Sequence, residues 1–223
     1  MIREFDRSAF YEKEPELLVE GLSGGRRANA DVFYFNSGEG EWVLKDFSHC
    51  APLIRKTWGR WAVQREYETL LRLQGVEGVP ADPFRLDAYA VGYRFVRGCN
   101  LRDVAHDVIP DDFFYLLEKT IMQMHDRNIV HLDMRNRRNI LMQSDGKPVL
   151  LDFQTSLNLR RVPRHLRALL KDIDLSGVYK LWKRRRPDLF DGHRMKHLDA
   201  VNRKRAVWFF KGYPMGMGKK IKK

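Results

Sequence analysis

The stretch HLDMRNRRNILMQSDGKPVLLDF, residues 131–153, decides the fold of this chain. It contains two aspartates, Asp133 and Asp152, and between them two short apolar runs within 140–151 that are joined by an Asp-Gly turn. This pattern predicts a β-hairpin. Because the outer ends of paired strands lie side by side, we expect both carboxylates to face one small volume, with Asn139 between them. Oxygen ligands grouped in this way suit Mg²⁺, which takes one or two carboxylates together with water and phosphate oxygens.

The chain has 223 residues, of which 43% are hydrophobic, so it is long enough to bury the core of one domain or of two closely packed lobes. Its formal net charge of +12 is unevenly distributed. Residues 1–153 contain 21 basic residues (Lys and Arg) and 24 acidic residues (Asp and Glu). Residues 154–223 contain 20 basic and 5 acidic residues. A segment this basic favours an anionic partner, which is nucleic acid, a membrane surface, or an acidic or phosphorylated substrate. A solvated basic surface is the alternative.

The two cysteines, Cys50 and Cys99, lie in different segments and have no metal-ligand spacing. A secreted disulfide framework normally contains more cysteines, so we expect the reducing environment of the cytosol. The N-terminus lacks the apolar core of a signal peptide, and no segment approaches the roughly 20 apolar residues of a membrane span. The sequence therefore predicts a cytoplasmic protein, with at most a peripheral contact at the inner face of an anionic membrane.

The first hundred residues have the pattern of an antiparallel sheet with one helix. A short leading helix is expected over 15–19, and the glycine-rich GLSGG that follows contains Gly21, Gly24 and Gly25. Glycines between strands let backbone N–H groups approach phosphate oxygens, although glycine is also the ordinary residue of tight turns. The predicted strands are 32–35, 42–47, 84–90 and 91–96.

Lys45 lies in an otherwise apolar predicted strand, and Glu66 follows about twenty residues later in a helix predicted over 65–73. A strand lysine and a helix glutamate in this order suggest a buried ion pair that directs the ammonium group towards phosphate. An exposed lysine on the strand is the alternative interpretation. Other candidate partners in the sequence are Asp46, Arg65 and Glu68.

The rest of the chain is predicted to be mostly helical. Its clearest amphipathic pattern, over 111–125, leads directly into the 131–153 stretch. Aromatic residues among the cations of the tail suit an anionic membrane interface or nucleic acid, whereas packing of these aromatics on the protein is the alternative. The predicted basic helices are 163–171, 176–185 and 194–210, and the tail aromatics are Trp182, Trp208, Phe209 and Phe210.

The chain resembles the protein-kinase-like superfamily through five residues in matching order and spacing: Lys45, Glu66, Asp133, Asn139 and Asp152. The sequence HLDMRNRRNIL is similar to the catalytic loop H-x-D-…-N of that superfamily, and LLDFQ is similar to its metal-binding D-F-G. The compact length and the sequence GRWAVQREYETLLRLQGVEGVP look most like small bacterial kinases near lipopolysaccharide-core sugar kinases and RIO-type kinases. The resemblance covers roughly residues 17–180.

The resemblance implies an α+β, two-lobed fold. Residues 1–97 would form an N-terminal lobe of antiparallel sheet and one helix, and residues 98–223 a reduced, mostly helical C-terminal lobe. It also implies ATP and Mg²⁺ as cofactors, and a reaction that transfers the γ-phosphate of ATP to a hydroxyl group.

The resemblance further assigns roles to single residues. Asp133 and Lys45 would be catalytic, while Asn139 and Asp152 would bind the metal. Arg135, which with Arg137 and Arg138 surrounds Asp133, is the third catalytic candidate, because a guanidinium suits the transferring phosphoryl group or an anionic acceptor. A solvated loop is the alternative for these arginines. His125 and His131 are expected to orient the catalytic loop rather than to bind metal. Adenine would lie near 95–98. The predicted nucleotide-binding residues are Gly21, Gly24, Gly25, Lys45, Glu66, Phe95 and Val96.

The sequence departs from the superfamily pattern at three places. Asn139 lies six positions after Asp133 instead of the usual five, which makes Asn136 the alternative metal ligand. Gln154 replaces the glycine of D-F-G, and GLSGG is a loose match to the family's glycine loop.

Three functions are consistent with these patterns. The first is a kinase acting on a hydroxyl of an anionic, membrane-associated glycan such as a lipopolysaccharide-core sugar. The second is a RIO-like kinase whose acceptor is a protein serine or threonine. The third is a pseudokinase that binds nucleotide, RNA or a protein partner through its basic tail without turnover.

Overall fold

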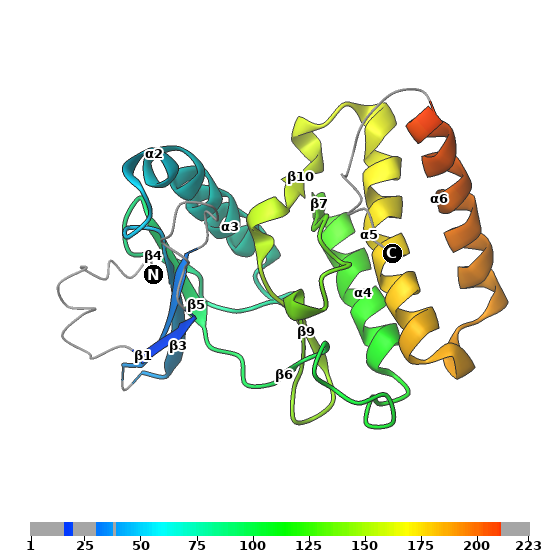
Figure 1. Ribbon diagram of the computed structural model, residues 1–223, viewed down its shortest axis with the longest axis horizontal. Helices are drawn as coiled ribbons and strands as arrows, with labels where there is room; N and C mark the ends of the chain where they lie inside the picture. Colours follow the sequence, from blue (N-terminus) through cyan, green and yellow to red (C-terminus); the bar gives the residue numbers. More distant parts are fainter. Residues whose placement is uncertain (1–15, 20–29, 38, 211–223) are drawn as a thin grey trace, which may run out of the picture.

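The computed structural model describes residues 16–19, 30–37 and 39–210, with side chains described within 30–37 and 39–204. A sheet with one long helix packed beside it makes one end of the molecule, and three long helices make the other (Figure 1). This arrangement confirms the predicted α+β class. The linker that follows β5 leads from the sheet to the helical part, and the segment between α3 and β4 also reaches that part, where the Gly78 carbonyl accepts from the Leu150 N–H over 2.8 Å.

The N-terminal part is an antiparallel sheet with strand order β1-β2-β3-β5-β4. In β3 the side chains alternate between two faces. Trp42 and Leu44 pack with Phe33 and Phe35 of the neighbouring strand, whereas Val43 belongs to the main core that α3 also enters. Lys45 lies two residues after Val43 and therefore on the same face. The strands are β1 (Glu16–Val19), β2 (Asp31–Asn36), β3 (Glu41–Asp46), β4 (Phe84–Arg85) and β5 (Ala90–Arg94).

The prediction of a helix over 15–19 is wrong, because Glu16–Val19 forms strand β1. Its backbone pairs antiparallel with β2, in a register that places Glu16 opposite Tyr34 and Leu17 opposite Phe33. A local sequence pattern does not reveal that the edge of β2 offers a row of backbone hydrogen-bonding groups, and this tertiary pairing decides the conformation.

The helix predicted over 65–73 begins much earlier than expected. It starts with α2 (Pro52–Ile54), passes through one π-helical segment, η1 (Arg55–Gly59), and continues as α3 (Arg60–Leu73). Pro52 at the first helical position suits a helix start, since its missing N–H has no partner to lose there. The buried residues of α3 include Ala62, Glu66 and Leu70, which recur at helical spacing and face the sheet.

The C-terminal part contains the predicted hairpin, made of β8 and β9, between helix α4 and helix α5. Its strands end within one residue of the predicted positions, and Gly146 of the Asp-Gly turn has a φ of 82°. The elements are β6 (Cys99–Asn100), α4 (Phe113–Asp126), β7 (Ile129–Val130), η2 (Arg137–Asn139), β8 (Ile140–Met142), β9 (Pro148–Leu150), η3 (Phe153–Thr155), β10 (Leu157–Asn158), η4 (Leu159–Arg161), α5 (Arg164–Arg185), η5 (Pro187–Leu189) and α6 (Gly192–Phe210).

The helices predicted over 163–171 and 176–185 are one helix, α5. Residues 172–175 continue it, and the hydroxyl of Ser176 donates to the carbonyl of Ile173 inside the helix. Trp182 of this helix is fully buried and stacks on Phe114 of α4, with ring centroids 5.6 Å apart. Packing on the protein is therefore the correct interpretation for Trp182, and the side chains of the other three tail aromatics lie outside the described part.

The strands predicted over 84–90 and 91–96 are shorter than expected. Residues 86–89 form a connection in which the backbone N–H of Tyr89 donates to the Asp87 carboxylate, and Leu86 N–H donates to the Ala90 carbonyl. Within the described residues, no helix has the length and apolar character needed to cross a membrane.

Candidate functional site

Lys45, Glu66 and Asp152 meet where the sheet, α3 and the hairpin adjoin. The Lys45 ammonium lies 2.8 Å from Glu66 Oε1 and 3.3 Å from Asp152 Oδ1. The Lys45 side chain is 10% exposed and that of Glu66 is fully buried, while that of Asp152 is 41% exposed. The predicted lysine–glutamate pair is thus present, and its ammonium group also reaches the aspartate of the hairpin. The alternative partner Arg65 donates instead to the Ser156 carbonyl.

The charges of this cluster stabilise one another. Burial lowers the pKa of Lys45, but the nearby carboxylates, Glu66 first, outweigh this and hold it well above its ordinary value. Burial raises the pKa of Glu66, an effect that Lys45 opposes only in part. Burial also raises the pKa of Asp152, but the charge and hydrogen bond of Lys45 outweigh this and lower the pKa of Asp152 below its ordinary value. At neutral pH the site therefore presents a fixed ammonium beside an ionised, half-exposed carboxylate.

Asp133 lies in a second cluster together with two asparagines. Asn139 Nδ2 donates to Asp133 Oδ2 over 2.9 Å, and Asn136 Nδ2 lies 3.4 Å from the same oxygen. Asn136 Nδ2 also donates to Asn139 Oδ1 over 3.0 Å. The extra residue between Asp133 and Asn139 is accommodated in the loop before β8, where 137–139 form a short 3₁₀ turn. Asn139 consequently stays beside Asp133 despite the longer spacing.

Backbone and imidazole groups connect the two clusters. The Leu151 N–H donates to the Asn139 carbonyl over 2.8 Å. His131 lies between the loop and the hairpin: its Nε2 is 3.0 Å from the Leu151 carbonyl, and its Nδ1 is 3.3 Å from the Asp133 N–H. Since Nδ1 accepts from a backbone N–H, the ring proton resides on Nε2 and donates to the carbonyl. His131 therefore orients the loop, as predicted.

Sequence reasoning missed Asp174 of α5, which holds the start of the loop 131–139. Its carboxylate is fully buried and accepts from the backbone N–H groups of His131 and Leu132, each over 2.7 Å. His125 Nε2 lies 3.2 Å from the same carboxylate. Leu132 has a φ of 67°, a left-handed conformation that costs free energy for a non-glycine residue and that these bonds stabilise. The only available signal was an aspartate between two apolar residues, Ile173 and Leu175, in the short gap between the helices predicted over 163–171 and 176–185.

Gly177, one turn after Asp174, lies directly against the catalytic loop. A Cβ at this position would lie 2.8 Å from Met134 Cβ, so the loop backbone would have to move. We expect Gly177→Ala to destabilise the protein by about 1–3 kcal/mol, as overpacking commonly does. The matched control is Gly192→Ala, where a Cβ meets nothing within 4 Å. Urea unfolding measures both variants, and equal stabilities would show that the contact with Met134 is not tight.

The remaining predicted residues are placed as follows. Arg135 is exposed in the loop between Asp133 and Asn136. Phe95 and Val96 are half-buried in the linker after β5, where the Phe95 N–H donates to the Glu41 carbonyl over 3.0 Å. The predicted glycine-loop residues Gly21, Gly24 and Gly25 lie outside the described residues.

The oxygen donors near Asp152 fit Mg²⁺. Asp152 has a left-handed φ of 63° and would supply a half-exposed carboxylate. Asn139 would supply its amide oxygen, which is buried and in this structure accepts from Asn136 Nδ2 over 3.0 Å. Among the described residues no group of three or more His, Cys, Asp or Glu side chains suits a metal ion. One carboxylate and one amide oxygen match a hard cation that completes its shell with water and phosphate oxygens.

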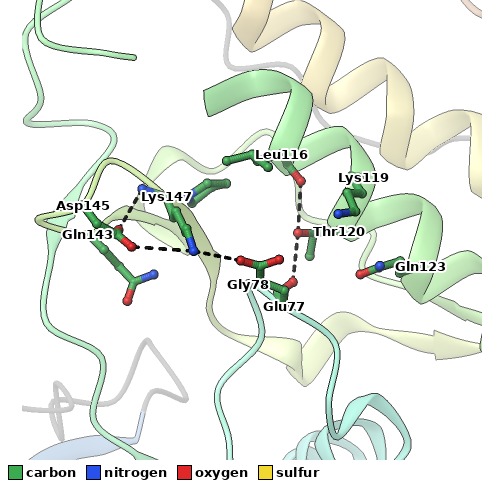
Figure 2. A pocket seen from close by; sticks show the side chains of 10 residues that line it. Glu77, Gly78, Leu116, Lys119, Thr120, Gln123, Gln143, Asp145 and Lys147 are labelled. Carbon is green, nitrogen blue, oxygen red and sulfur yellow. Dashed lines mark hydrogen bonds and ion pairs between the residues drawn. The ribbon is translucent and has the colours of Figure 1, made fainter. Parts of the chain in front are cut away.

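A cavity of about 250 Å³ lies away from these residues, between the β8–β9 turn and α4 (Figure 2). Three of its charged side chains pair with one another, since Lys147 Nζ lies 3.1 Å from Glu77 Oε1 and 3.9 Å from Asp145 Oδ2. The Thr120 hydroxyl bonds to the Glu77 carbonyl over 3.0 Å. None of the predicted site residues lines this cavity.

Comparisons with known proteins support the kinase-like arrangement. A scan against protein families matches residues 45–195 to the RIO domain. A search of curated proteins found no match. Among solved structures, the Rio2 kinase from Chaetomium thermophilum is similar with a TM-score of 0.58 and 15% identity, over 90% of this chain and 76% of that chain. The Rio2 kinase-ADP/Mg2+-phosphoaspartate complex from the same organism is similar with a TM-score of 0.57 and 16% identity, over 90% of this chain and 74% of that chain.

The family match extends over two thirds of the chain and includes both clusters, from Lys45 to Asp152 and beyond through Asp174. The structural likenesses show the same fold. Together they support the predicted enzyme class, a phosphotransferase of the kinase type. The chain therefore belongs to the RIO domain family, within the protein-kinase-like superfamily.

Proposed function

We propose that this protein is an ATP- and Mg²⁺-dependent kinase that transfers the γ-phosphate to a serine or threonine hydroxyl of a protein. The observation that carries the proposal is the buried Lys45–Glu66 pair in contact with Asp152, beside the Asp133–Asn139 pair. Phosphoryl transfer is catalysed mainly by positioning and by neutralisation of charge, and these two clusters supply both. The similarity to a Rio2 kinase-ADP/Mg2+ complex supports the choice of nucleotide and metal.

Each residue has a proposed role. Lys45, held by Glu66, would bind phosphate oxygens of the nucleotide. Asp152 and Asn139 would hold Mg²⁺, which would supply neutralisation of phosphate charge. Asp133 would accept the proton of the attacking hydroxyl or orient that hydroxyl, with its Oδ2 positioned by the amide of Asn139.

Further roles follow from position. Arg135, exposed beside Asp133, neutralises the transferring phosphoryl group or binds an anionic acceptor. Asn136 positions Asn139 through their 3.0 Å bond, and it remains the alternative metal ligand. The proposed adenine site is the linker around Phe95 and Val96, and Gly21, Gly24 and Gly25 are proposed to cover the phosphates.

The same proposal extends to the lobes and to the cell compartment. We place the boundary between the lobes at 97/98, because β5 ends at Arg94 and β6 begins at Cys99 in a different sheet.

Both cysteines are free thiols, which suits the reducing cytosol.

The acceptor is the finer part of the proposal. A lipopolysaccharide-core sugar, the first of the expected acceptors, gains no support from the comparisons, because the family match falls on the RIO domain. A protein hydroxyl fits that match better. An acceptor with anionic character suits the arginines of the catalytic loop, Arg135, Arg137 and Arg138.

Incubation of the full chain with Mg²⁺ and γ-labelled ATP tests the proposal. One arm contains protein mixtures and the other contains core oligosaccharide. We expect label on serine or threonine of protein, and loss of labelling by about 10²-fold or more in Asp152→Ala, because the metal loses its carboxylate. Labelling of the oligosaccharide alone would contradict the protein acceptor, and equal labelling by wild type and Asp152→Ala would contradict catalysis at this site.

A further inference from the structure

A second cavity, of about 370 Å³, lies between α3 and the segment 156–162 that follows the metal-binding aspartate. It is separate from the ATP site, since Lys45, Asp133 and Asp152 do not line it. Its two walls are nevertheless tied to that site. Arg65 of α3 donates to the Ser156 carbonyl over 2.7 Å, and the Ser156 hydroxyl donates to the Phe153 carbonyl over 2.6 Å.

The rim of this cavity is cationic. Arg65, Arg72 and Arg161 contribute guanidinium groups, while Glu68 is the one carboxylate among its lining residues. Arg161 is 74% exposed and lies 3.8 Å from Glu68, a loose contact that leaves most of its guanidinium open to solvent. Burial and the neighbouring Arg161 charge lower the pKa of Arg65, as expected where cations crowd together. An anionic ligand would relieve this repulsion.

The cavity is also lined by aliphatic side chains, those of Ile129, Leu157 and Val162, of which Ile129 is fully buried. The hydroxyls of Thr69 and Ser156 are buried and bond to each other over 2.8 Å, so neither requires a ligand. Aliphatic side chains together with a cationic rim select a ligand that has a large apolar group flanked by negative charges.

The aromatic residue of the cavity, Trp61, favours a peptide over a nucleic acid. Arg65 covers its ring from the following helical turn, 4.1 Å from the centroid, and Trp58 packs against it from the preceding turn, with centroids 4.7 Å apart. Single-stranded nucleic acids bind through bases that stack on open aromatic rings. Trp61 remains 42% exposed, but Arg65 and Trp58 already contact its ring, and the other apolar side chains that line the cavity are aliphatic.

We propose that this cavity is a docking site for an acidic protein segment that carries a large apolar side chain. The apolar side chain enters between α3 and 156–162, and its acidic neighbours pair with Arg72 and Arg161 at the rim. The bound segment contacts both walls, one of which is the helix that carries Glu66. This interaction is additional to catalysis and does not depend on the proposed kinase activity.

The test measures binding by fluorescence anisotropy, with the full chain and without nucleotide. The probe is a short fluorescein-labelled peptide of glutamates around one phenylalanine. We expect binding to wild type, weakening by about tenfold or more in the double variant Arg72→Glu/Arg161→Glu, and no change in Arg203→Glu. Arg203 is an exposed arginine of α6, on the far side of the molecule from α3 (Figure 1). Thermal melting of the three proteins verifies that they fold equally.

The peptide chemistry is tested by two further probes. Replacing the phenylalanine of the peptide by alanine should weaken binding, and replacing the glutamates by lysines should abolish it. The proposal is overturned if wild type does not bind the peptide, or if the double variant binds as wild type does. It is also overturned if poly(U) RNA displaces the peptide and itself loses affinity in the double variant, since the surface would then bind nucleic acid.

Discussion

Asp133→Asn is expected to abolish phosphoryl transfer while the affinity for Mg²⁺-ATP is retained. The amide has nearly the shape of the carboxylate and still offers an oxygen to Asn139 Nδ2, which lies 2.9 Å from Asp133 Oδ2. It has no negative charge and cannot accept the proton of an attacking hydroxyl. Loss of a general base lowers rates by about 10²–10⁴-fold. Rates with γ-labelled ATP, and titration with a fluorescent nucleotide, separate transfer from binding.

The control for Asp133→Asn is Asp199→Asn, the same substitution at an exposed position of α6. It should leave both transfer and nucleotide affinity unchanged. If Asp133→Asn transfers phosphate within tenfold of wild type, then Asp133 is not the base. If instead it loses nucleotide affinity while transfer at saturating nucleotide persists, Asp133 acts in binding.

The second large effect is expected at Asp174. Removal of its carboxylate in Asp174→Ala leaves two buried backbone N–H groups, those of His131 and Leu132, without their acceptor. It also removes the partner of His125. Unsatisfied buried donors and a lost buried carboxylate should together lower the free energy of unfolding by about 3–5 kcal/mol. Transfer should fall as well, because the left-handed conformation of Leu132 loses its support.

Asp172 provides a matched control two residues earlier on the same helix. Its side chain is 19% exposed, and its carboxylate lies 3.3 Å from the exposed Lys204 and 3.6 Å from His197. Ion pairs with exposed side chains contribute about 0–1 kcal/mol, so Asp172→Ala should cost less than Asp174→Ala. Urea unfolding of both variants measures the difference. Comparable losses of stability in the two variants would mean that the buried carboxylate does not hold the loop.

Some of the site was predictable because it depends on short-range patterns. The hairpin between Asn139 and Asp152 follows from two apolar runs and an Asp-Gly turn, and its strands end within one residue of the prediction. Lys45 in an apolar strand and Glu66 in an amphipathic helix also follow from local periodicity. Which carboxylate pairs with Lys45 was open in the sequence. The face of α3 that packs on the sheet decides it, since this places Glu66 inwards and fully buried.

Other features depend on contacts that are remote in the chain. Asp174 bonds to backbone groups more than forty positions earlier, and no spacing within one element encodes that contact. The strand at 16–19 forms because the edge of β2 offers backbone hydrogen-bonding groups, although the local sequence pattern predicts a helix. The helix break expected near 172–175 is absent, since α5 runs without interruption through Ser176 and Gly177. In this part of α5 the loop 131–139 packs closely on the helix, at Gly177.

The residue types of the site, their order and the hairpin that separates Asp133 from Asp152 follow from local patterns. These depend on the period of strands and helices and on turn chemistry, which act over a few residues. The position of Asn139 beside Asp133 despite the extra residue, and the support of the loop by Asp174 of α5, are seen only in the folded chain. Buried polar groups must find hydrogen-bonding partners, and the packing of distant segments determines which partners are within reach.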